Sequence, residues 1–248
     1  MSSSVPKSSH DALWMDGEPP AEHFDPEVLS GQPDGAQRYL RRSIAPGTPL
    51  FRAVRFRLQG RLYVAGRWHR FEGVEVLRPE RGFDFRANVR FFGLPLPGLD
   101  SCVDGQAHLE WKLFGAIPVV RSAGPKVDRS ALGRLHLERI WLPTSLVHCP
   151  WTEHDPRKIS APIESHGLRT ELFVELDSNE DPLAIWGERH RDDDPSHVDV
   201  FGGKVSAWAD WAGVRIPTQL RLGWGFGTER FEKGGVFFEA SLDEVEFR

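Results

Sequence analysis

The stretch "GFDFRANVRFF", residues 82–92, alternates apolar and polar side chains along its whole length. Its apolar positions are Phe83, Phe85, Ala87, Val89 and Phe91. In a β-strand, a period of two residues places these side chains on one face and the intervening polar ones on the other. The stretch therefore predicts a strand with one face on a core and one face in water, as is typical of antiparallel sheets.

The same period recurs over most of the chain. Alternating segments cover residues 51–60, 61–77, 106–115, 167–177, 182–191, 203–224 and 234–247, and short Gly-containing turns separate many of them. Residues 94–102 read as a loop. We expect roughly ten strands, and a sheet of that size has to curl rather than stay flat. The predicted fold is mainly β, one curved antiparallel sheet that forms a half-barrel or a barrel.

The chain divides into two parts of different composition. Residues 1–33 are rich in Ser, Pro, Asp and Glu, which is typical of a mobile N-terminal segment. Residues 34–44 have helically spaced apolar side chains with Asp34 as a candidate N-cap, and they predict one N-terminal helix. We expect residues 34–248 to form a single β-rich half-barrel domain.

A second helix is predicted in the middle of the chain, within residues 128–142. Its apolar side chains share one stripe at helical spacing, and Asp128 or Ser130 is the candidate N-cap. Pro143 disfavours helical geometry at the residue before it and should end the helix there. We expect this helix to lie against the sheet as a central plug.

The composition excludes several classes of function. The formal net charge of -5 and the pI of about 6.1 argue against nucleic acid as a partner. The N-terminal residues contain no apolar core of a secretory signal, and no run of about 18 apolar residues predicts integral membrane association. We therefore expect a cytoplasmic protein. Cys102 and Cys149 could form one disulfide, although a single pair in a chain of this size is more typical of two reduced thiols.

Residues 136–155, "HLERIWLPTSLVHCPWTEHD", concentrate histidine, cysteine and carboxylate side chains. Zinc sites favour short, regular ligand pairs, whereas the spacing of His148 and His154 fits none of these and a proline stands between them. The acidic residues 192–194 and Asp199 lack the glycine and terminal glutamate of an EF-hand calcium loop. No Gly-x-Ser-x-Gly motif marks a nucleophile. We expect no metal and no cofactor.

Glu138 is the carboxylate of this segment that bears most directly on function. On the central helix it falls at the edge of the apolar stripe, where burial in a cavity would raise the pKa of a general acid or base. The alternative is an ion pair with an arginine such as Arg134 or Arg139. If the protein is an enzyme, the candidate catalytic residues are Glu138, Asp155 and His136.

Large aromatic side chains are abundant, with nine Trp and 16 Phe against two Tyr. Any one of them could simply fill the core, but together they exceed what a thin sheet-and-helix layer needs. A curled sheet lined by them would form an apolar concave pocket. The candidate ligand-binding residues are Phe83, Phe85, Trp111, Trp141, Trp151, Trp208, Trp224 and Phe238.

Two blocks of sequence resemble a known family. Residues 133–155 contain the pattern Glu-x-x-Trp-x-Pro-x-x-Leu followed by a Trp and an Asp, and residues 203–247 contain the hairpin "GKVSAWADWAGVRIPTQLRLGW" and the strand that ends the chain. In this order they are similar to an uncharacterised bacterial family of unknown function, DUF6544, over about residues 36–247. The positions that this resemblance marks are Glu138, Trp141, Pro143, Trp151, Asp155, Gly213 and Pro217.

The resemblance implies a shape but no activity. The family's general shape resembles lipoprotein-carrier (Lol-type) half-barrels, in which helices plug the mouth of a curved antiparallel sheet. Fold alone does not give function, and the lack of an export signal here counts against lipid trafficking in the periplasm.

Three functions remain open from the sequence. The first is a binding protein that holds a hydrophobic small molecule or an acyl chain in an aromatic-lined cavity. The second is a metal-independent isomerase, cyclase or hydrolase acting on an apolar substrate through Glu138 with Asp155 or a histidine. The third is a structural or interaction protein with a solid core. The sequence does not fix the oligomeric state.

Overall fold

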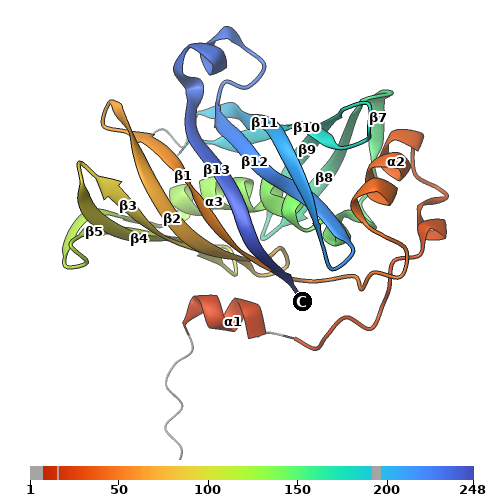
Figure 1. Ribbon diagram of the computed structural model, residues 1–248, viewed down its shortest axis with the longest axis horizontal. Coiled ribbons are helices and arrows are strands. Elements are labelled where there is room, and N and C mark those ends of the chain that lie inside the picture. Colours follow the sequence, from red (N-terminus) through yellow and green to blue (C-terminus); the bar gives the residue numbers. More distant parts are fainter. Residues whose placement is uncertain (1–7, 16, 192–196) are drawn as a thin grey trace, which may run out of the picture.

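The computed structural model describes residues 8–15, 17–191 and 197–248, and in them the chain forms one antiparallel sheet of 13 strands. The first six strands are β1 Val54–Val64, β2 Arg67–Arg78, β3 Gly82–Phe91, β4 Leu94–Val103, β5 Gln106–Leu113 and β6 Ile117–Ala123. The other seven are β7 Thr152–Asp155, β8 Lys158–Ser165, β9 Leu168–Leu176, β10 Pro182–His190, β11 Val198–Trp211, β12 Val214–Trp224 and β13 Val236–Phe247. The predicted curved antiparallel sheet is confirmed (Figure 1).

The strand order shows two meanders joined side by side. The order is β6-β5-β4-β3-β2-β1-β13-β12-β11-β10-β9-β8-β7, so β1 pairs with the last strand and the sheet ends at β6 and β7. The sheet is open, because no pairing joins these two edges. The chain between them includes helix α3, Pro125–Glu138, and the short turns η2, Arg139–Trp141, and η3, Pro143–Leu146. This connection runs along the hollow of the sheet (Figure 1).

The strand that decided the fold behaves as its alternation predicts. On β3 the apolar side chains Phe83, Phe85 and Val89 are buried, and Arg90 between them and the turn is exposed. The one exception is Asp84, which is fully buried because helix α1, Ser9–Met15, covers the outer face of β2 and β3.

The strand count differs from the expected ten, for two physical reasons. Residues 61–77 were expected to hold two strands of their own, but they contain the end of β1, a turn and most of β2, because β1 continues through Gly60 to Val64. A Cβ at Gly60 would lie 1.9 Å from the Glu239 carbonyl oxygen, so this glycine marks close approach between strands and not a turn. Strands β6, β7 and β8 were not expected, since β6 is an exposed edge without alternation and β7 has only four residues.

The predicted loop at residues 94–102 was wrong, because this segment is strand β4. Its two prolines explain both the prediction and the outcome. Strand β5 pairs with β4 only from Gly98 onward. Past the end of this pairing, the Phe114 N–H donates to the Pro95 carbonyl at 3.0 Å, so the backbone groups of Pro95 point toward β5. The nitrogens of Pro95 and Pro97 face the β5 side of β4, so neither proline removes a hydrogen bond from the ladder with β3.

Both predicted helices form, with different N-caps from those expected. Helix α2 spans Asp34–Ser43, and its cap position is Pro33 without a side-chain hydrogen bond. Helix α3 begins after Gly124, since Pro125 suits the first helical turn. Asp128 instead accepts a hydrogen bond from the backbone N–H of Ala107 at 2.7 Å and ties the helix to β5. The α-helix ends at Glu138, and the turns η2 and η3 follow on either side of Leu142.

Much of the described N-terminal chain packs on the sheet domain. Leu13 on α1, Phe24, and Leu29 on the turn η1, Pro26–Leu29, are buried. The division at residue 33 and the mobility of the preceding segment stay predictions. The acidic residues 192–194 lie outside the described residues. Cys102 and Cys149 are both free thiols.

No helix in the described part of the chain is both long and apolar enough to cross a membrane.

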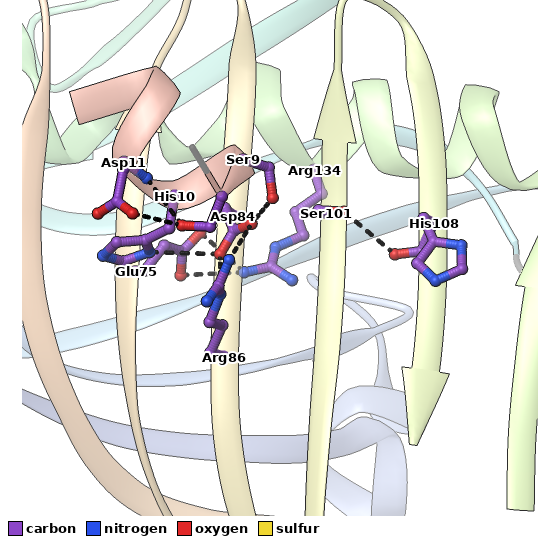
Figure 2. Close-up of polar contacts among 10 residues, drawn as sticks. Ser9, His10, Asp11, Glu75, Asp84, Arg86, Ser101, His108 and Arg134 are labelled. Atoms are coloured by element: carbon purple, nitrogen blue, oxygen red, sulfur yellow. Dashed lines mark hydrogen bonds and ion pairs between the residues drawn. The ribbon is translucent and has the colours of Figure 1, made fainter. Parts of the chain in front are cut away.

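Asp84 fixes α1 on the outer face of the sheet. Its carboxylate accepts hydrogen bonds from Ser9, from His10 at 3.3 Å and from Arg86 at 2.7 Å (Figure 2). Burial alone would raise the pKa of Asp84, but these hydrogen bonds outweigh it and hold the pKa below its usual value. A carboxyl with a lowered pKa stabilises the fold at pH values above the ordinary aspartate pKa. This contribution is lost as the pH falls from there through the lowered pKa of the folded state.

We expect Asp84→Asn to lower the free energy of unfolding at pH 7 by about 1–3 kcal/mol, because the buried charge-assisted hydrogen bonds are lost. The difference from the wild type should shrink as the pH falls below the ordinary aspartate pKa of about 3.9. Urea denaturation over this pH range measures both effects. Asp243→Asn, on an exposed position of β13, is the control and should change neither.

Candidate functional site

The concave face of the sheet and helix α3 enclose a cavity of about 560 Å³. Strands from both meanders and the helix supply its walls. Most of its lining side chains are aliphatic or aromatic, and those from the strands and turns are Leu62, Tyr63, Val64, Phe85, Val89, Phe91, Leu96, Leu109, Trp111, Val119, Val120, Ile185, Phe201, Leu222, Phe237 and Phe238. Leu137, Ile140 and Trp141 line it from the crossing segment. The cavity is therefore an apolar chamber between sheet and plug.

A buried ionic cluster contributes the polar part of the lining. Arg134 of α3 donates to Glu75 on β2 at 2.9 Å (Figure 2). It also donates to Asp100 on β4 at 2.7 Å and to Glu138 one helical turn along. All four side chains line the cavity, and Glu75 is almost completely buried. One guanidinium thus faces three carboxylates in an apolar surrounding.

Aromatic rings hold the guanidinium in place. The Arg134 guanidinium carbon lies 4.3 Å from the ring centroid of Phe83 and 5.1 Å from that of Phe85. Such cation–π contacts strengthen where water is excluded. Burial alone would lower the pKa of Arg134, but Glu138, Glu75 and Asp100 together keep it above its ordinary value. Arg134 is therefore a permanent cation at this site.

The excess of carboxylates favours the protonated form of Glu75. Burial, the largest cause, raises the pKa of Glu75 well above its ordinary value; Arg134 opposes this, and Glu138 and Asp100 add to it. A protonated Glu75 can donate a hydrogen bond to Glu138, whose Oε2 has no other partner in the described chain. The cluster therefore places a carboxyl group with a raised pKa in the lining of an apolar cavity.

A second arginine lines the cavity from β10. Arg189 donates to the carbonyl and hydroxyl oxygens of Ser130 on α3, at 2.9 and 3.1 Å. Its guanidinium lies over the rings of Phe201 and Trp224, at 4.9 and 5.4 Å. Arg189 thus fixes the start of the plug helix against the second meander.

The structure separates the three residues that were predicted as catalytic. Glu138 lines the cavity and pairs with Arg134, so the arginine pairing considered from the sequence is present. Asp155 does not reach the cavity, since it is exposed at the end of β7, where it accepts from the backbone N–H of Arg157 at 2.9 Å. Glu138 and Asp155 therefore do not face one cavity, because Asp155 lies on the edge strand β7, outside the cavity lining.

His136 lies on the opposite side of α3 from the cavity. Both of its ring nitrogens are 2.7 Å from a hydroxyl oxygen, that of Thr170 and that of Ser165. Burial, the largest cause, and the nearby Arg139 and His166 lower the pKa of His136 to about 3. His136 is therefore neutral near pH 7 and holds α3 on β8 and β9 without facing the cavity.

Four of the predicted ligand-binding residues line the cavity, namely Phe85, Trp111, Trp141 and Phe238. The other four lie elsewhere. Phe83 supports Arg134, Trp224 supports Arg189, and Trp208 donates its indole N–H to the Pro182 carbonyl at 3.0 Å. Trp151 packs edge-on against Tyr39 of α2 with centroids 5.6 Å apart. That any of these side chains binds a ligand stays a prediction.

Glu75 and Asp100 are the site residues that the sequence reasoning missed. Glu75 carried a usable signal, because it occupies an inward position of an alternating strand between Gly73 and Leu77. A carboxylate at such a position needs a buried cationic partner. Nothing local identifies Asp100, which reaches Arg134 across 34 residues of sequence.

Other features of the described chain are less suited to hold a ligand. A shallow depression of about 650 Å³ on the outer face of β1–β5 is lined by charged side chains such as Arg57, Glu72 and Arg86. It is open to water and would leave an apolar molecule exposed. Within residues 8–15, 17–191 and 197–248, no group of three or more His, Cys, Asp or Glu side chains is arranged to hold a metal ion.

The sequence model of the family of unknown function DUF6544 matches residues 22–234. This chain belongs to DUF6544. The resemblance that the two sequence blocks carry is therefore confirmed, and no curated protein matches this member of the family significantly.

Three solved structures are similar in shape to this DUF6544 member. A LolA superfamily protein from Nitrosomonas europaea has a TM-score of 0.45 at 9% identity, covering 86% of this chain and 92% of its own. A domain described as a putative outer membrane lipoprotein-sorting protein, from Vibrio parahaemolyticus, has a TM-score of 0.42 at 7% identity. The match covers 89% of this chain and 93% of that domain. A DUF1329 family protein from Desulfovibrio piger has a TM-score of 0.42 at 11% identity, and the match covers 90% of this chain and 94% of that protein.

Substitutions in the ionic cluster of this DUF6544 member should have opposite effects on stability. Arg134→Met removes the cation from three carboxylates, and we expect a loss of about 3–5 kcal/mol at pH 7. A raised pKa in the folded state means that the wild type loses stability as the pH rises above the ordinary glutamate value. Glu75→Gln removes this loss, so it should be as stable as the wild type or more stable at pH 8.

Denaturant unfolding of the three proteins between pH 4 and pH 8 tests this arrangement. A Glu75→Gln protein that is destabilised by the same amount at every pH would show that Glu75 is ionised in the fold. Glu72→Gln, at an exposed position three residues earlier on β2, serves as the matched control.

Proposed function

We propose that this protein binds an elongated apolar molecule, such as one with an acyl chain, in the cavity between the sheet and α3. The observation that carries the proposal is the cavity itself, about 560 Å³ of space lined mainly by aliphatic and aromatic side chains. This volume is in the range of small-molecule sites. The energetic reason is burial, since each CH₂ group removed from water contributes about 0.8 kcal/mol.

The ionic cluster favours one kind of polar group on the ligand. Glu75, Asp100 and Glu138 outnumber Arg134, so the polar part of the cavity repels a carboxylate head group. The oxygen of a neutral amide, ester or alcohol head can accept a hydrogen bond from a protonated Glu75, and an amide N–H or an alcohol O–H can donate to Glu138. We therefore infer that the ligand is apolar with an uncharged polar group, and that free fatty-acid anions bind less well.

A second candidate function follows from the exchangeable proton of this cluster. Glu75 with a raised pKa and the partly unpaired Glu138 form an acid and a base next to an apolar chamber. Such a pair could transfer a proton within a bound apolar substrate, as in an isomerisation. This candidate replaces the one that combined Glu138 with Asp155 or His136.

The cytoplasmic location that the sequence suggests stays a prediction.

Ligand binding is tested by filling the cavity. Val89→Trp with Leu109→Trp places two large rings in the cavity, and binding of a fluorescent apolar probe should weaken by roughly tenfold or more. The matched control is Val28→Trp with Leu183→Trp, which adds the same rings at two exposed positions outside the cavity and should leave binding unchanged. Circular dichroism verifies that both proteins are folded.

Native mass spectrometry of protein purified without detergent provides the complementary measurement. We expect a co-purified apolar molecule in the wild type and none in the filled-cavity variant. Absence of any bound molecule, together with equal probe binding by all three proteins, would refute the proposal.

Proton transfer is tested by comparing ligands recovered from the wild type, Glu75→Gln and Glu138→Gln after incubation in deuterated water. Deuterium uptake by the bound molecule in the wild type alone would support catalysis. Identical molecules without deuterium from all three proteins would leave binding as the only function of the cavity.

A further inference from the structure

Three hairpin turns lie next to one another at one end of the first meander. They join β1 to β2 at residues 65–66, β3 to β4 at residues 92–93, and β5 to β6 at residues 114–116, and their strands lie at the left of Figure 1. The Arg67 guanidinium lies 5.2 Å from the ring centroid of Phe92, and the Phe114 N–H donates to the Pro95 carbonyl. These contacts connect each turn to the next in one row.

This end of the sheet exposes an unusual amount of apolar side chain. Eight of the twelve large apolar residues that are exposed in the described chain belong to residues 63–64, 92–94 and 114–120, which we call the apolar rim. Phe92 is 54% exposed, and Phe114 and Ile117 are each 58% exposed. Scattered single apolar residues are normal on a surface, but a contiguous group of this kind marks an interaction site.

The two exposed phenylalanines also occupy an unfavourable backbone conformation. Phe92 has φ 49° and Phe114 has φ 53°, and a glycine with positive φ follows each of them. Hairpin turns of this type favour Asn, Asp or Gly at the first position, and a bulky residue there is an outlier. Backbone preference therefore does not explain phenylalanine at either turn, and burial explains little of it, because each side chain is more than half exposed.

The opposite end of the same strands has different chemistry. The turns between β2 and β3 and between β4 and β5 carry Glu80, Arg81 and Asp104, and Arg81 pairs with Asp104 at 2.5 Å. Asp104 occupies the left-handed position, with φ 51°, that Phe92 and Phe114 occupy at the rim. The apolar side chains are thus a property of one end and not of this turn type.

The charge around the apolar rim is mainly positive, although Glu110 pairs with Lys112 and Arg121, and Glu239 pairs with Arg61. Residues 61–71, 89–99 and 111–121 contain no Asp or Glu, whereas they contain six Arg and Lys residues. Three of these, Arg67, Arg70 and Arg90, are exposed and form no ion pair with the residues that the structure describes. Tyr63 and Trp68 stack edge-on beside them at 5.5 Å. Exposed apolar tips, Tyr and Trp, and unpaired arginines together match the interface of an anionic bilayer.

We propose that the apolar rim docks on the surface of an anionic lipid bilayer, with Phe92, Phe114 and Ile117 inserted among the lipids and the arginines on the head groups. The rim is also the mouth of the cavity, since Tyr63, Val64, Val119 and Val120 line it. Docking would therefore place the opening of the chamber against the bilayer. The docking surface is a separate property from ligand binding, and it holds or fails on its own test.

Co-sedimentation with vesicles tests the docking surface. The wild type should sediment with vesicles of phosphatidylglycerol and phosphatidylethanolamine in equal amounts, and much less with vesicles of phosphatidylcholine alone. Added salt should weaken this binding, because head-group attraction is screened. Phe92→Asn with Phe114→Asn should reduce partitioning by roughly tenfold or more, because two large apolar side chains no longer insert.

The same double substitution is designed to preserve the fold. Asparagine suits the left-handed turn position, so the variant should unfold at the same or a higher denaturant concentration than the wild type. Its binding of the fluorescent apolar probe without vesicles should equal that of the wild type, which separates loss of docking from loss of the cavity. Val28→Asn with Leu183→Asn removes two exposed apolar side chains elsewhere and should not affect sedimentation.

Charge is tested by Arg67→Gln, Arg70→Gln and Arg90→Gln together, which should abolish the preference for anionic vesicles. The proposal is overturned if the wild type binds neither kind of vesicle, or if Phe92→Asn with Phe114→Asn sediments as the wild type does. It is also overturned if the wild type ignores lipid and instead dimerises through the rim, as shown by a dimer that this double variant loses.

Discussion

The constraint on which the rest of the structure depends is the position of the two sheet edges. Strands β6 and β7 are consecutive in sequence but lie at opposite ends of a 13-stranded order. The intervening chain must cross the whole sheet, and it does so along the concave face, where its apolar side chains Leu135, Leu137 and Ile140 are buried. The connection thereby covers the concave face of the open, curved sheet. The space between them that side chains leave unfilled is the cavity.

The same crossing explains the polar cluster inside an apolar chamber. Arg134 comes from the crossing helix, whereas Glu75 and Asp100 come from strands of the first meander. Isolated burial of any one of these groups would cost several kcal/mol, so they are tolerated because the helix brings the cation to the carboxylates. One guanidinium neutralises only one of the three carboxylates, and the excess of negative charge is among the causes that raise the pKa of Glu75. The result is an apolar chamber whose polar region carries an excess of carboxylates.

The first meander has two chemically different ends. One end carries paired charges at its turns, and the other carries exposed phenylalanines, isoleucine and unpaired arginines around the mouth of the chamber. The apolar lining of the cavity extends from the apolar rim at one end to the ionic cluster of Arg134. Under the two proposals, an apolar ligand would move between the chamber and a bilayer without passing through water.

The sequence by itself determined which face of each alternating strand is buried, the two main helices, and the supply of aromatic side chains, because a period of two or 3.6 residues is a local property. For Glu138 it left a catalytic role and an ion pair with Arg134 or Arg139 both open, and the pair with Arg134 is present. Only the tertiary structure decided that Glu75 meets Arg134 across 59 residues, that Asp155 points away, and that β4 is a strand despite its prolines. Each of these depends on which strands are neighbours and on where a helix crosses them. The pairing of β1 with β13 and the path of α3 bring together residues distant in sequence, and no local pattern records such contacts.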